Sequence, residues 1–248
     1  MIRRYAALRP AFALICARLI YAKMRRLAVI VPAAAIPAAV HSDAAMAQMP
    51  SQFTIIRDGG SPIGHHSVAF SRDGDGNLVV QIEIDIAVRM AFVTVFRYRH
   101  SGREVWRGDR LIALQTETND DGQRMSVSAR ATPEGVEVIG PHGRLVLPPD
   151  IRTTSWWRAD TMQQRQLLDN QDGRVVNIVA TPAGTVMRRR GEQDVPITMW
   201  RLSPVGGYSD IALGYTARGQ WAAMHFRSRG SRIDYAEPGE TSTATFAR

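Results

Sequence analysis

The residues best suited to chemistry are histidines that have acidic or aromatic neighbours. His65 and His66 are adjacent, and His100 lies four residues before Glu104. Imidazole and carboxylate groups bind zinc and similar ions, and they also act as general acids and bases. Adjacent residues of a strand point to opposite faces, so His65 and His66 cannot serve one site without a bulge. Because no two ligands have a metal-binding spacing, we expect no metal site and no cofactor.

A hydrolase or metal-assisted enzyme is the alternative hypothesis. It would have to bring His100, Glu104 and Asp172 together in one concave pocket. The sequence contains no nucleophile elbow, no phosphate-binding Walker loop and no dinucleotide-binding fingerprint. The acidic run at residues 73–77 begins like a calcium loop but lacks the glycine and glutamate that such a loop requires. We therefore assign no catalytic residue.

Two adjacent tryptophans favour binding over catalysis. Trp156 and Trp157 follow a Pro-Pro loop and cannot both point inward if the segment is extended. One of them is expected at a surface or at the mouth of a cavity, where it can contact an apolar ligand. The simpler alternative is one core side chain and one partly buried ring. The candidate ligand-binding residues are His65, Arg97, Tyr98, His100, Glu104, Trp106, Trp156, Trp157 and Asp172.

The net charge of the chain comes mainly from its N-terminal region. Of 31 basic and 23 acidic residues, seven and one lie in residues 1–47, which leaves 24 and 22 in the remainder, a charge of only +2. Nucleic-acid binders need a basic footprint, so we expect no nucleic-acid partner. The arginine run at 188–190 and the stripe of Arg97, Arg99 and Arg103 are expected to be solvated or to contact anionic lipid headgroups.

Residues 1–47 have the features of an export signal. Met24 opens a basic start, Leu27–Val40 supplies an apolar stretch, and Ala45-Met46-Ala47 supplies small residues before a cut at Gln48. Because a complete signal follows it, Met24 is the expected initiator. The alternative is a membrane anchor in the earlier apolar stretch, which two arginines interrupt. The sequence therefore predicts a periplasmic or secreted protein. We expect it to bind a lipid-like ligand or an envelope partner, and a structural or assembly protein with no small ligand is a further alternative that the sequence leaves open.

The predicted mature chain must fold without disulfides. Cys16 is the only cysteine and lies in the predicted signal region. Stability must then come from a packed core, for which a chain of this length is sufficient. Nothing marks a second domain, so we expect a single β domain over residues 48–237 and a frayed tail over 238–248. The sequence leaves the oligomeric state open.

Closely spaced strands dominate the predicted structure. Apolar and polar residues alternate from Val80 to Val88, which predicts a strand with one buried face. The turn residues at 73–77 join it to a strand at Ile63–Ser71. Similar strands and turns follow at short intervals, which predicts an all-β fold with a strongly curved antiparallel sheet, barrel-like or half-barrel. One short helix is expected over Thr161–Leu168, with Asp160 and Gln163 as a capping box.

Several local motifs resemble a family of exported bacterial proteins classed only as a domain of unknown function. They include the Ile63-Gly64-His65 run, the Glu104-Val105-Trp106 run, the Asn119-Asp120-Asp121-Gly122 turn and the Asp169–Gly173 segment. The resemblance covers roughly residues 52–235. It implies a periplasmic β-rich domain, and it supplies no catalytic residues to transfer.

Overall fold

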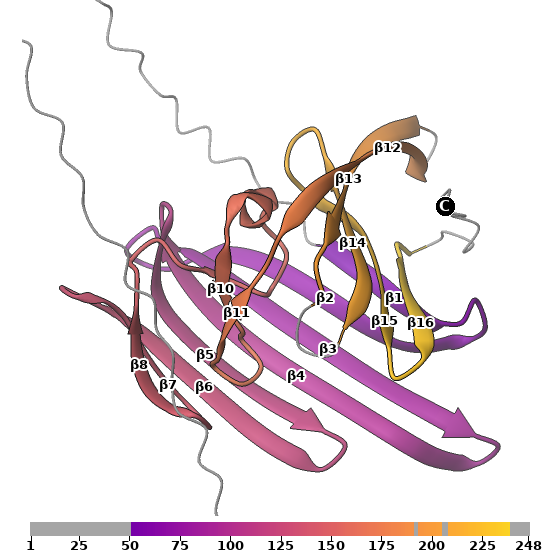
Figure 1. Ribbon diagram of the computed structural model, residues 1–248, viewed down its shortest axis with the longest axis horizontal. Helices are drawn as coiled ribbons and strands as arrows, with labels where there is room; N and C mark the ends of the chain where they lie inside the picture. The colour runs from indigo at the N-terminus through magenta and orange to yellow at the C-terminus, as the bar shows by residue number, and fades with distance from the viewer. Residues whose placement is uncertain (1–50, 191–192, 205–207, 239–248) are drawn as a thin grey trace, which may run out of the picture. The chain divides into compact units, whose positions relative to one another are not determined.

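Thirteen antiparallel strands form one continuous sheet (Figure 1). The computed structural model describes residues 51–190, 193–204 and 208–238. The strand order is β12-β13-β14-β15-β16-β1-β2-β3-β4-β5-β6-β7-β8, and β9, β10 and β11 form a second, three-stranded sheet. Consecutive strands are neighbours because each tight turn returns the chain beside itself. The fold is therefore all-β and antiparallel in its main sheet, as the strand spacing predicts.

The strands of the first half are β1 (Ser51–Arg57), β2 (Pro62–Arg72), β3 (Leu78–Met90), β4 (Val93–Arg107), β5 (Arg110–Asp120), β6 (Gln123–Thr132), β7 (Gly135–Gly140) and β8 (Gly143–Leu147). The small sheet contains β9 (Arg152–Thr153), β10 (Gln166–Leu168) and β11 (Val175–Asn177). The last strands are β12 (Ala180–Arg190), β13 (Gln193–Leu202), β14 (Ser209–Thr216), β15 (Trp221–Ser228) and β16 (Ser231–Ala236).

The strand β1 joins the two halves of the sheet. Ile55 lies opposite Gly64 of β2 on one side and opposite Tyr235 of β16 on the other. The pairing of β1 with β16 joins the first and the last strand of the domain in sequence order. It brings the inner faces of the two strand runs toward each other, and the small sheet packs between them. Thr116 of β5, for example, donates a 2.6 Å hydrogen bond to the carbonyl oxygen of Asn170, just after β10.

The period-two pattern of β3 determines which face is buried. Val80 and Ile82 are almost fully buried, whereas Gln81 and Glu83 are exposed. Close contact between strands also constrains one residue of the Ile-Gly-His run. A Cβ atom on Gly64 would lie 2.1 Å from the carbonyl oxygen of Asp85, so only glycine fits there.

The predicted helix over Thr161–Leu168 is wrong in its extent. The structure has a short 3-10 helix at Ala159–Gln163, and the strand β10 follows it. The carboxylate of Asp160 does not cap a helix, because it accepts hydrogen bonds from Arg152 and Arg158 instead. Leu167 and Leu168 of β10 are fully buried, and β10 pairs with β9 and β11, so tertiary contacts override the local helical preference.

The described residues fall within one compact unit. The predicted signal region at 1–47 and almost all of the predicted tail at 238–248 lie outside the described residues. Over the part of the chain that the structure describes, no helix has the length and apolar character needed to cross a bilayer.

Candidate functional site

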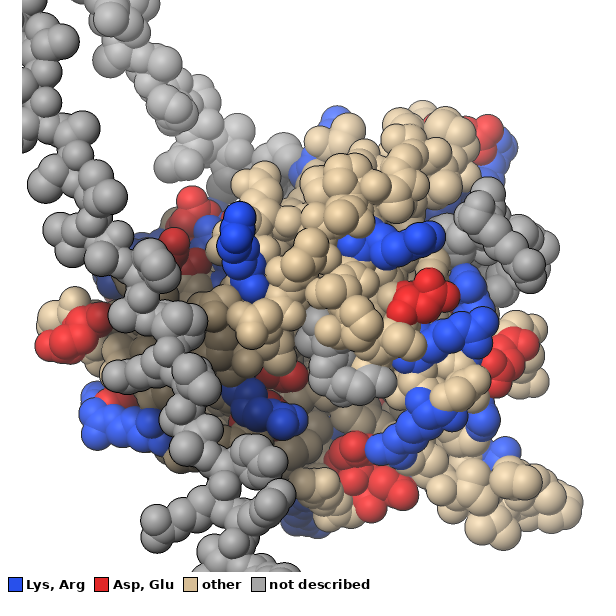
Figure 2. Space-filling model, viewed as in Figure 1, with Lys and Arg blue, Asp and Glu red and all other residues tan. Residues whose placement is uncertain are grey.

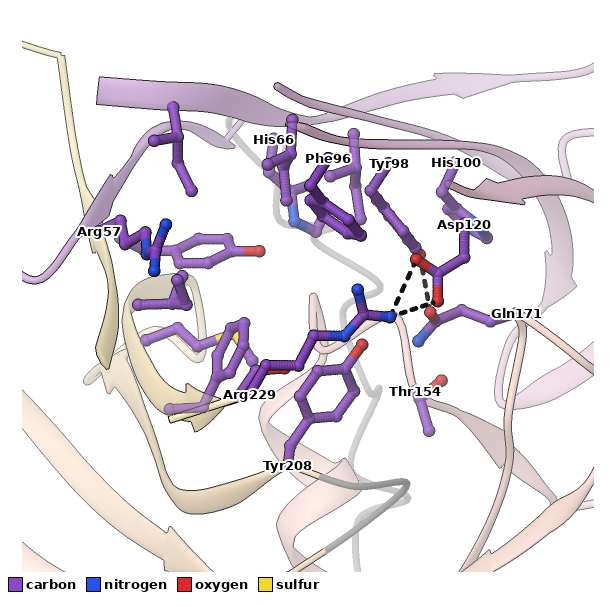
Figure 3. Close-up of a pocket in the computed structure, with 18 of the residues that line it drawn as sticks. Arg57, His66, Phe96, Tyr98, His100, Asp120, Thr154, Gln171, Tyr208 and Arg229 are labelled. Carbon is purple, nitrogen blue, oxygen red and sulfur yellow. Dashed lines mark hydrogen bonds and ion pairs between the residues drawn. The ribbon is translucent and has the colours of Figure 1, made fainter. Parts of the chain in front are cut away.

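A pocket of about 350 Å³ lies between the inner face of β2–β4 and the strands β14–β16 (Figure 3). Along β3, Ile82, Ile84, Ile86 and Val88 line it at every second residue. Ile82 is buried, and the three residues that follow are half-buried, so the pocket becomes more open toward the β3–β4 turn. The opposite wall is formed by Ile211, Met224, Phe226, Ile233 and Tyr235. The walls of the pocket are therefore mainly apolar.

Two histidines interrupt this apolar lining. The register places His66 of β2 and His100 of β4 on either side of Ile84, on the same face of the sheet. Only 3% of His66 and 2% of His100 is exposed to solvent. Both imidazoles thus line the deep part of the pocket, on the same side as Tyr98 and Phe96 (Figure 3).

The imidazole of His66 has aromatic neighbours but no hydrogen-bond partner among the described residues. Its ring lies edge-on to those of Trp221 and Tyr235, at centroid distances of 5.0 and 5.7 Å. Neither ring nitrogen makes a hydrogen bond. Burial, with a smaller contribution from nearby His100, lowers the pKa of His66 to about 3, so the ring is neutral at neutral pH. It then presents one unused donor and one unused acceptor.

The imidazole of His100 has only one partner among the described residues. Its Nδ1 lies 2.9 Å from the hydroxyl of Thr118, and that hydroxyl donates to the carbonyl oxygen of Gln171 at 3.2 Å. The hydroxyl proton of Thr118 is therefore already used in that hydrogen bond. We infer that Nδ1 of His100 is protonated and donates a hydrogen bond to the Thr118 oxygen. Burial lowers the pKa of His100 to about 4. Its Nε2 is then a buried acceptor without a partner.

The loop after β10 supplies further polar groups to the pocket. The hydroxyl of Tyr98 donates to Oε1 of Gln171 at 2.7 Å, which fixes the glutamine against β4. Burial raises the pKa of Asp169 to about 6, and Thr154 lies beside that carboxylate. Across the pocket, burial raises the pKa of Tyr208 to about 12, so its phenol keeps its proton. Polar side chains from this loop and from residues 154–155 thus form one part of the lining, next to the apolar walls.

An ion pair crosses the mouth of the pocket. Arg229, in the β15–β16 turn, lies 3.1 Å from the carboxylate of Asp120 at the end of β5 (Figure 3). The same guanidinium lies over the ring of Phe96 at 4.7 Å. The arginine side chain is 65% exposed and the aspartate side chain 31%. This contact joins the two halves of the sheet where the pocket meets solvent.

A second polar cluster lies outside the pocket, around fully buried Glu104. Its Oε2 accepts hydrogen bonds from the indoles of Trp106 and Trp157, at 2.8 and 2.9 Å. Its Oε1 accepts a 2.8 Å hydrogen bond from the hydroxyl of Thr153. The carboxylate therefore ties the loop before the 3-10 helix to β4, which is a structural role.

The structure separates the residues predicted from sequence into three groups. Tyr98, His100 and Trp156 line the pocket, whereas Glu104, Trp106 and Trp157 form the buried cluster. The remaining three, His65, Arg97 and Asp172, do not line it: His65 is exposed, Arg97 bonds to Asp85 at 3.0 Å, and Asp172 bonds to Arg174 at 2.8 Å.

The residues of the enzyme alternative do not converge. His100 and Glu104 are four residues apart on one strand, roughly 13 Å along its axis. Asp172 is occupied by Arg174 and does not line the pocket. Within the described ranges, no group of three or more His, Cys, Asp or Glu side chains is placed to hold a metal ion.

Sequence reasoning weighed His66 only as a metal ligand and did not include it, Tyr208 or Arg229 among the ligand-binding candidates. The alternation of His66, Val68 and Phe70 along β2 was a usable signal, because it places the histidine on the same face as two apolar residues. No comparable local pattern marks Tyr208 or Arg229, which reach the pocket only through the pairing of distant strands.

The comparisons with known proteins identify a family and a fold. The sequence profile of the Domain of unknown function (DUF6134) matches residues 53–236, well over half of the chain. The chain belongs to the DUF6134 family. This DUF6134 domain resembles the crystal structure of a beta-barrel-like protein of domain of unknown function DUF1849 from Brucella abortus. The TM-score is 0.53 at 11% identity, over 75% of this chain and 93% of that chain. That likeness shows the fold alone. Among curated proteins, no significant match was found.

Proposed function

We propose that this DUF6134 domain binds one small amphipathic molecule in its internal pocket and does not transform it. The apolar walls accept the body of the ligand, and the polar groups on β2, β4 and the loop after β10 orient its polar end. The volume of about 350 Å³ is within the range of small-molecule sites. On the wall of β2–β4 the two imidazoles are neutral, and the phenol of Tyr98 already donates to Gln171, which favours an uncharged polar group on the ligand.

The unpaired imidazoles carry this proposal. Buried polar atoms in folded proteins almost always have a hydrogen-bond partner, and leaving one without a partner costs about 1–3 kcal/mol. Three ring nitrogens of His66 and His100 have none among the described residues, and all belong to side chains that line the pocket. A bound ligand provides the missing hydrogen bonds.

The inferred protonation of His100 limits the chemistry of that ligand. Because Nε2 is an acceptor, the polar end must carry a hydrogen-bond donor, such as the O–H of an alcohol or undissociated acid, or the N–H of an amide. An ionised carboxylate offers no such donor. The ligand we propose is therefore a neutral, lipid-like molecule with a donating headgroup.

The proposed site of action is the periplasm or the exterior of the cell. The export signal predicted before Gln48 supports it, as does a predicted mature chain without cysteine. The intact mass of the protein isolated from a periplasmic extract tests this, because cleavage before Gln48 yields one defined mass. Retention of all N-terminal residues in a cytoplasmic fraction would contradict it.

Binding is tested with the neutral probe N-phenyl-1-naphthylamine, whose fluorescence rises in apolar surroundings. Wild-type protein should bind it saturably at one site. Dodecan-1-ol should then displace it at lower concentration than dodecyl methyl ether, which has the same chain but no donor. The variant His100→Phe should reduce this preference by about tenfold, since one hydrogen bond to a buried acceptor is lost.

A matched pair of variants separates the pocket from the outer surface. Ile84→Trp fills the pocket and should abolish probe binding, whereas Glu83→Trp adds the same ring to the exposed face of the same strand and should leave it unchanged. Equal probe affinity in both variants would refute a site in this pocket. Equal displacement by the alcohol and the ether would refute the proposed headgroup chemistry.

A further inference from the structure

The β3–β4 turn exposes a compact group of large apolar side chains. Phe92 is 103% exposed, Met90 68%, Val93 64% and Val95 45%. These four residues, which we call the β3–β4 tip, account for half of the large exposed apolar side chains found in the described residues. Exposed apolar groups gathered in one place mark a contact surface, whereas single ones need no explanation.

The turn chemistry of the tip is unusual within this sheet. Other two-residue turns contain polar or turn-forming residues, such as Gly108-Asp109, Asp121-Gly122 and Arg229-Gly230. The β3–β4 turn is Ala91-Phe92, and Ala91 has a φ of 53°, a conformation in which glycine or asparagine is preferred. Arg229 has a similar φ of 50° in its own turn, so the backbone conformation does not set the β3–β4 turn apart. Its distinguishing feature is that both turn residues are apolar and that Phe92 is fully exposed.

The β3–β4 hairpin carries one charged residue around the tip. The segment from Ile86 to Phe96 holds Arg89 and no carboxylate. Just beyond it, Arg97 and Arg99 contact the carboxylate of Asp85 at 3.0 and 3.4 Å, and the backbone N–H of Arg97 donates to the carboxylate of Asp121 at 3.1 Å. Figure 2 shows the tip as an uncharged projection at the lower right, at the place of the β3–β4 turn in Figure 1. An apolar tip whose own hairpin segment holds Arg89 and no carboxylate suits a bilayer surface that contains anionic lipids.

The tip is continuous with the mouth of the pocket. Val95 belongs to the tip and also lines the pocket, and Val88 and Phe96 line it at the base of the same hairpin. Along β3 the pocket lining changes from buried Ile82 to the half-buried Ile84, Ile86 and Val88 nearer the tip. Whatever surface the tip contacts therefore lies next to the pocket opening.

We propose that the β3–β4 tip inserts into the interfacial region of a lipid bilayer that contains anionic lipids. A projection of four apolar side chains is too small for a stable protein interface, which buries about 800 Å² on each partner. It is sufficient for shallow insertion among headgroups and upper acyl chains. The proposal of membrane contact depends on the tip alone. Transfer of a ligand between the bilayer and the pocket would also require the proposed binding function.

A tryptophan placed at the tip tests insertion directly. The variant Phe92→Trp, as the processed chain that begins at Gln48, is mixed with vesicles of phosphatidylcholine and phosphatidylglycerol in which the phosphatidylcholine carries dibrominated acyl chains. The bromines quench a tryptophan that enters the acyl region, and the wild-type chain supplies the background of the native tryptophans. We expect quenching of the added tryptophan that weakens in vesicles without phosphatidylglycerol. The control Val146→Trp, at another exposed apolar position, should show none.

A flotation assay gives the second measurement. The double variant Phe92→Asn, Val93→Thr keeps residues that suit the turn and the strand, and it should reduce binding to the anionic vesicles by at least about tenfold. Val146→Thr is the matched control and should bind as wild type does.

No added quenching in Phe92→Trp, or unchanged flotation of the double variant, would overturn the proposal. Tip-dependent dimers in light scattering without vesicles would overturn it in favour of a second copy of the chain. Loss of probe binding in Ile84→Trp with retained flotation would separate this proposal from that of the pocket.

Discussion

The carboxylate of Glu104 accepts a 2.9 Å hydrogen bond from the indole of Trp157, fifty-three residues later in the chain. The two residues come from the strand β4 of the large sheet and from the loop that leads into the 3-10 helix. Trp106 donates to the same carboxylate oxygen. Three residues that sequence analysis singles out as candidate ligand contacts are thus used to join two parts of the fold.

This relationship predicts a contrast between two substitutions. Glu104→Ala leaves two buried indole donors without a partner and should lower the free energy of unfolding by about 3–5 kcal/mol. Glu104→Gln keeps a carbonyl oxygen for both indoles and should cost only about 1 kcal/mol. Urea denaturation followed by tryptophan fluorescence measures both. Similar losses in the two variants would show that the charge of the carboxylate, and not its acceptor geometry, stabilises the cluster.

The unpaired histidine of the pocket should reduce stability in the absence of ligand. The substitution His66→Phe replaces the imidazole by a phenyl ring. It removes two unsatisfied polar atoms at a site already surrounded by aromatic rings. We expect the free energy of unfolding to rise by about 1–2 kcal/mol. Thermal unfolding of ligand-free protein is the measurement. A decrease would indicate that His66 has a structural partner and would weaken the binding proposal.

The buried histidines also predict a dependence of stability on pH. Both rings are neutral in the folded protein because burial lowers their pKa values to about 3 and about 4, whereas an unfolded histidine titrates near 6.5. Below pH 6.5 the unfolded chain therefore takes up protons that the folded chain does not. Stability should fall by about 2 kcal/mol per histidine between pH 6.5 and about 5.

Asp169 acts in the opposite direction over the same range. Burial raises the pKa of its carboxyl to about 6, so its contribution to stability is present at low pH and is lost as the pH rises through that value. The comparison with a double variant, His66→Phe, His100→Phe, isolates the histidines because Asp169 is unchanged. Its stability should decline less with acidification than that of the wild type. Parallel pH profiles would contradict the assignment of neutral buried imidazoles.

The ion pair between Arg229 and Asp120 should affect the rate at which a ligand enters the pocket more than the folding stability of the protein. Because the arginine is mostly exposed, Arg229→Ala should change the free energy of unfolding by less than about 1 kcal/mol. The same change removes the contact across the mouth of the pocket and should speed both association and dissociation of N-phenyl-1-naphthylamine. Stopped-flow fluorescence measures both rates. Arg201→Ala, an exposed arginine that does not line the pocket, is the control.

Local pattern was enough to predict most of the strands. The alternation along β3 identifies both the strand and its buried face, because a strand turns successive side chains to opposite sides whatever its partners are. Glycine and asparagine at residues 73–77 identify the turn before it for an equally local reason. Asp160 shows the limit of such reasoning. The same carboxylate can cap a helix or bind arginines, and only the position of Arg152 decides between them.

The pocket depends on contacts that no local pattern contains. The sequence alone requires that the inward residues of β3 are apolar and that one of two adjacent histidines shares their face. The pairing of β1 with β16 establishes what lies opposite them, since it brings Tyr235 and Met224 across from His66. That pairing is set by the packing of the whole sheet, and no single segment encodes it. For this reason the sequence predicts the strand that contains His66, whereas only the tertiary structure shows that this histidine is buried without a hydrogen-bond partner among the described residues.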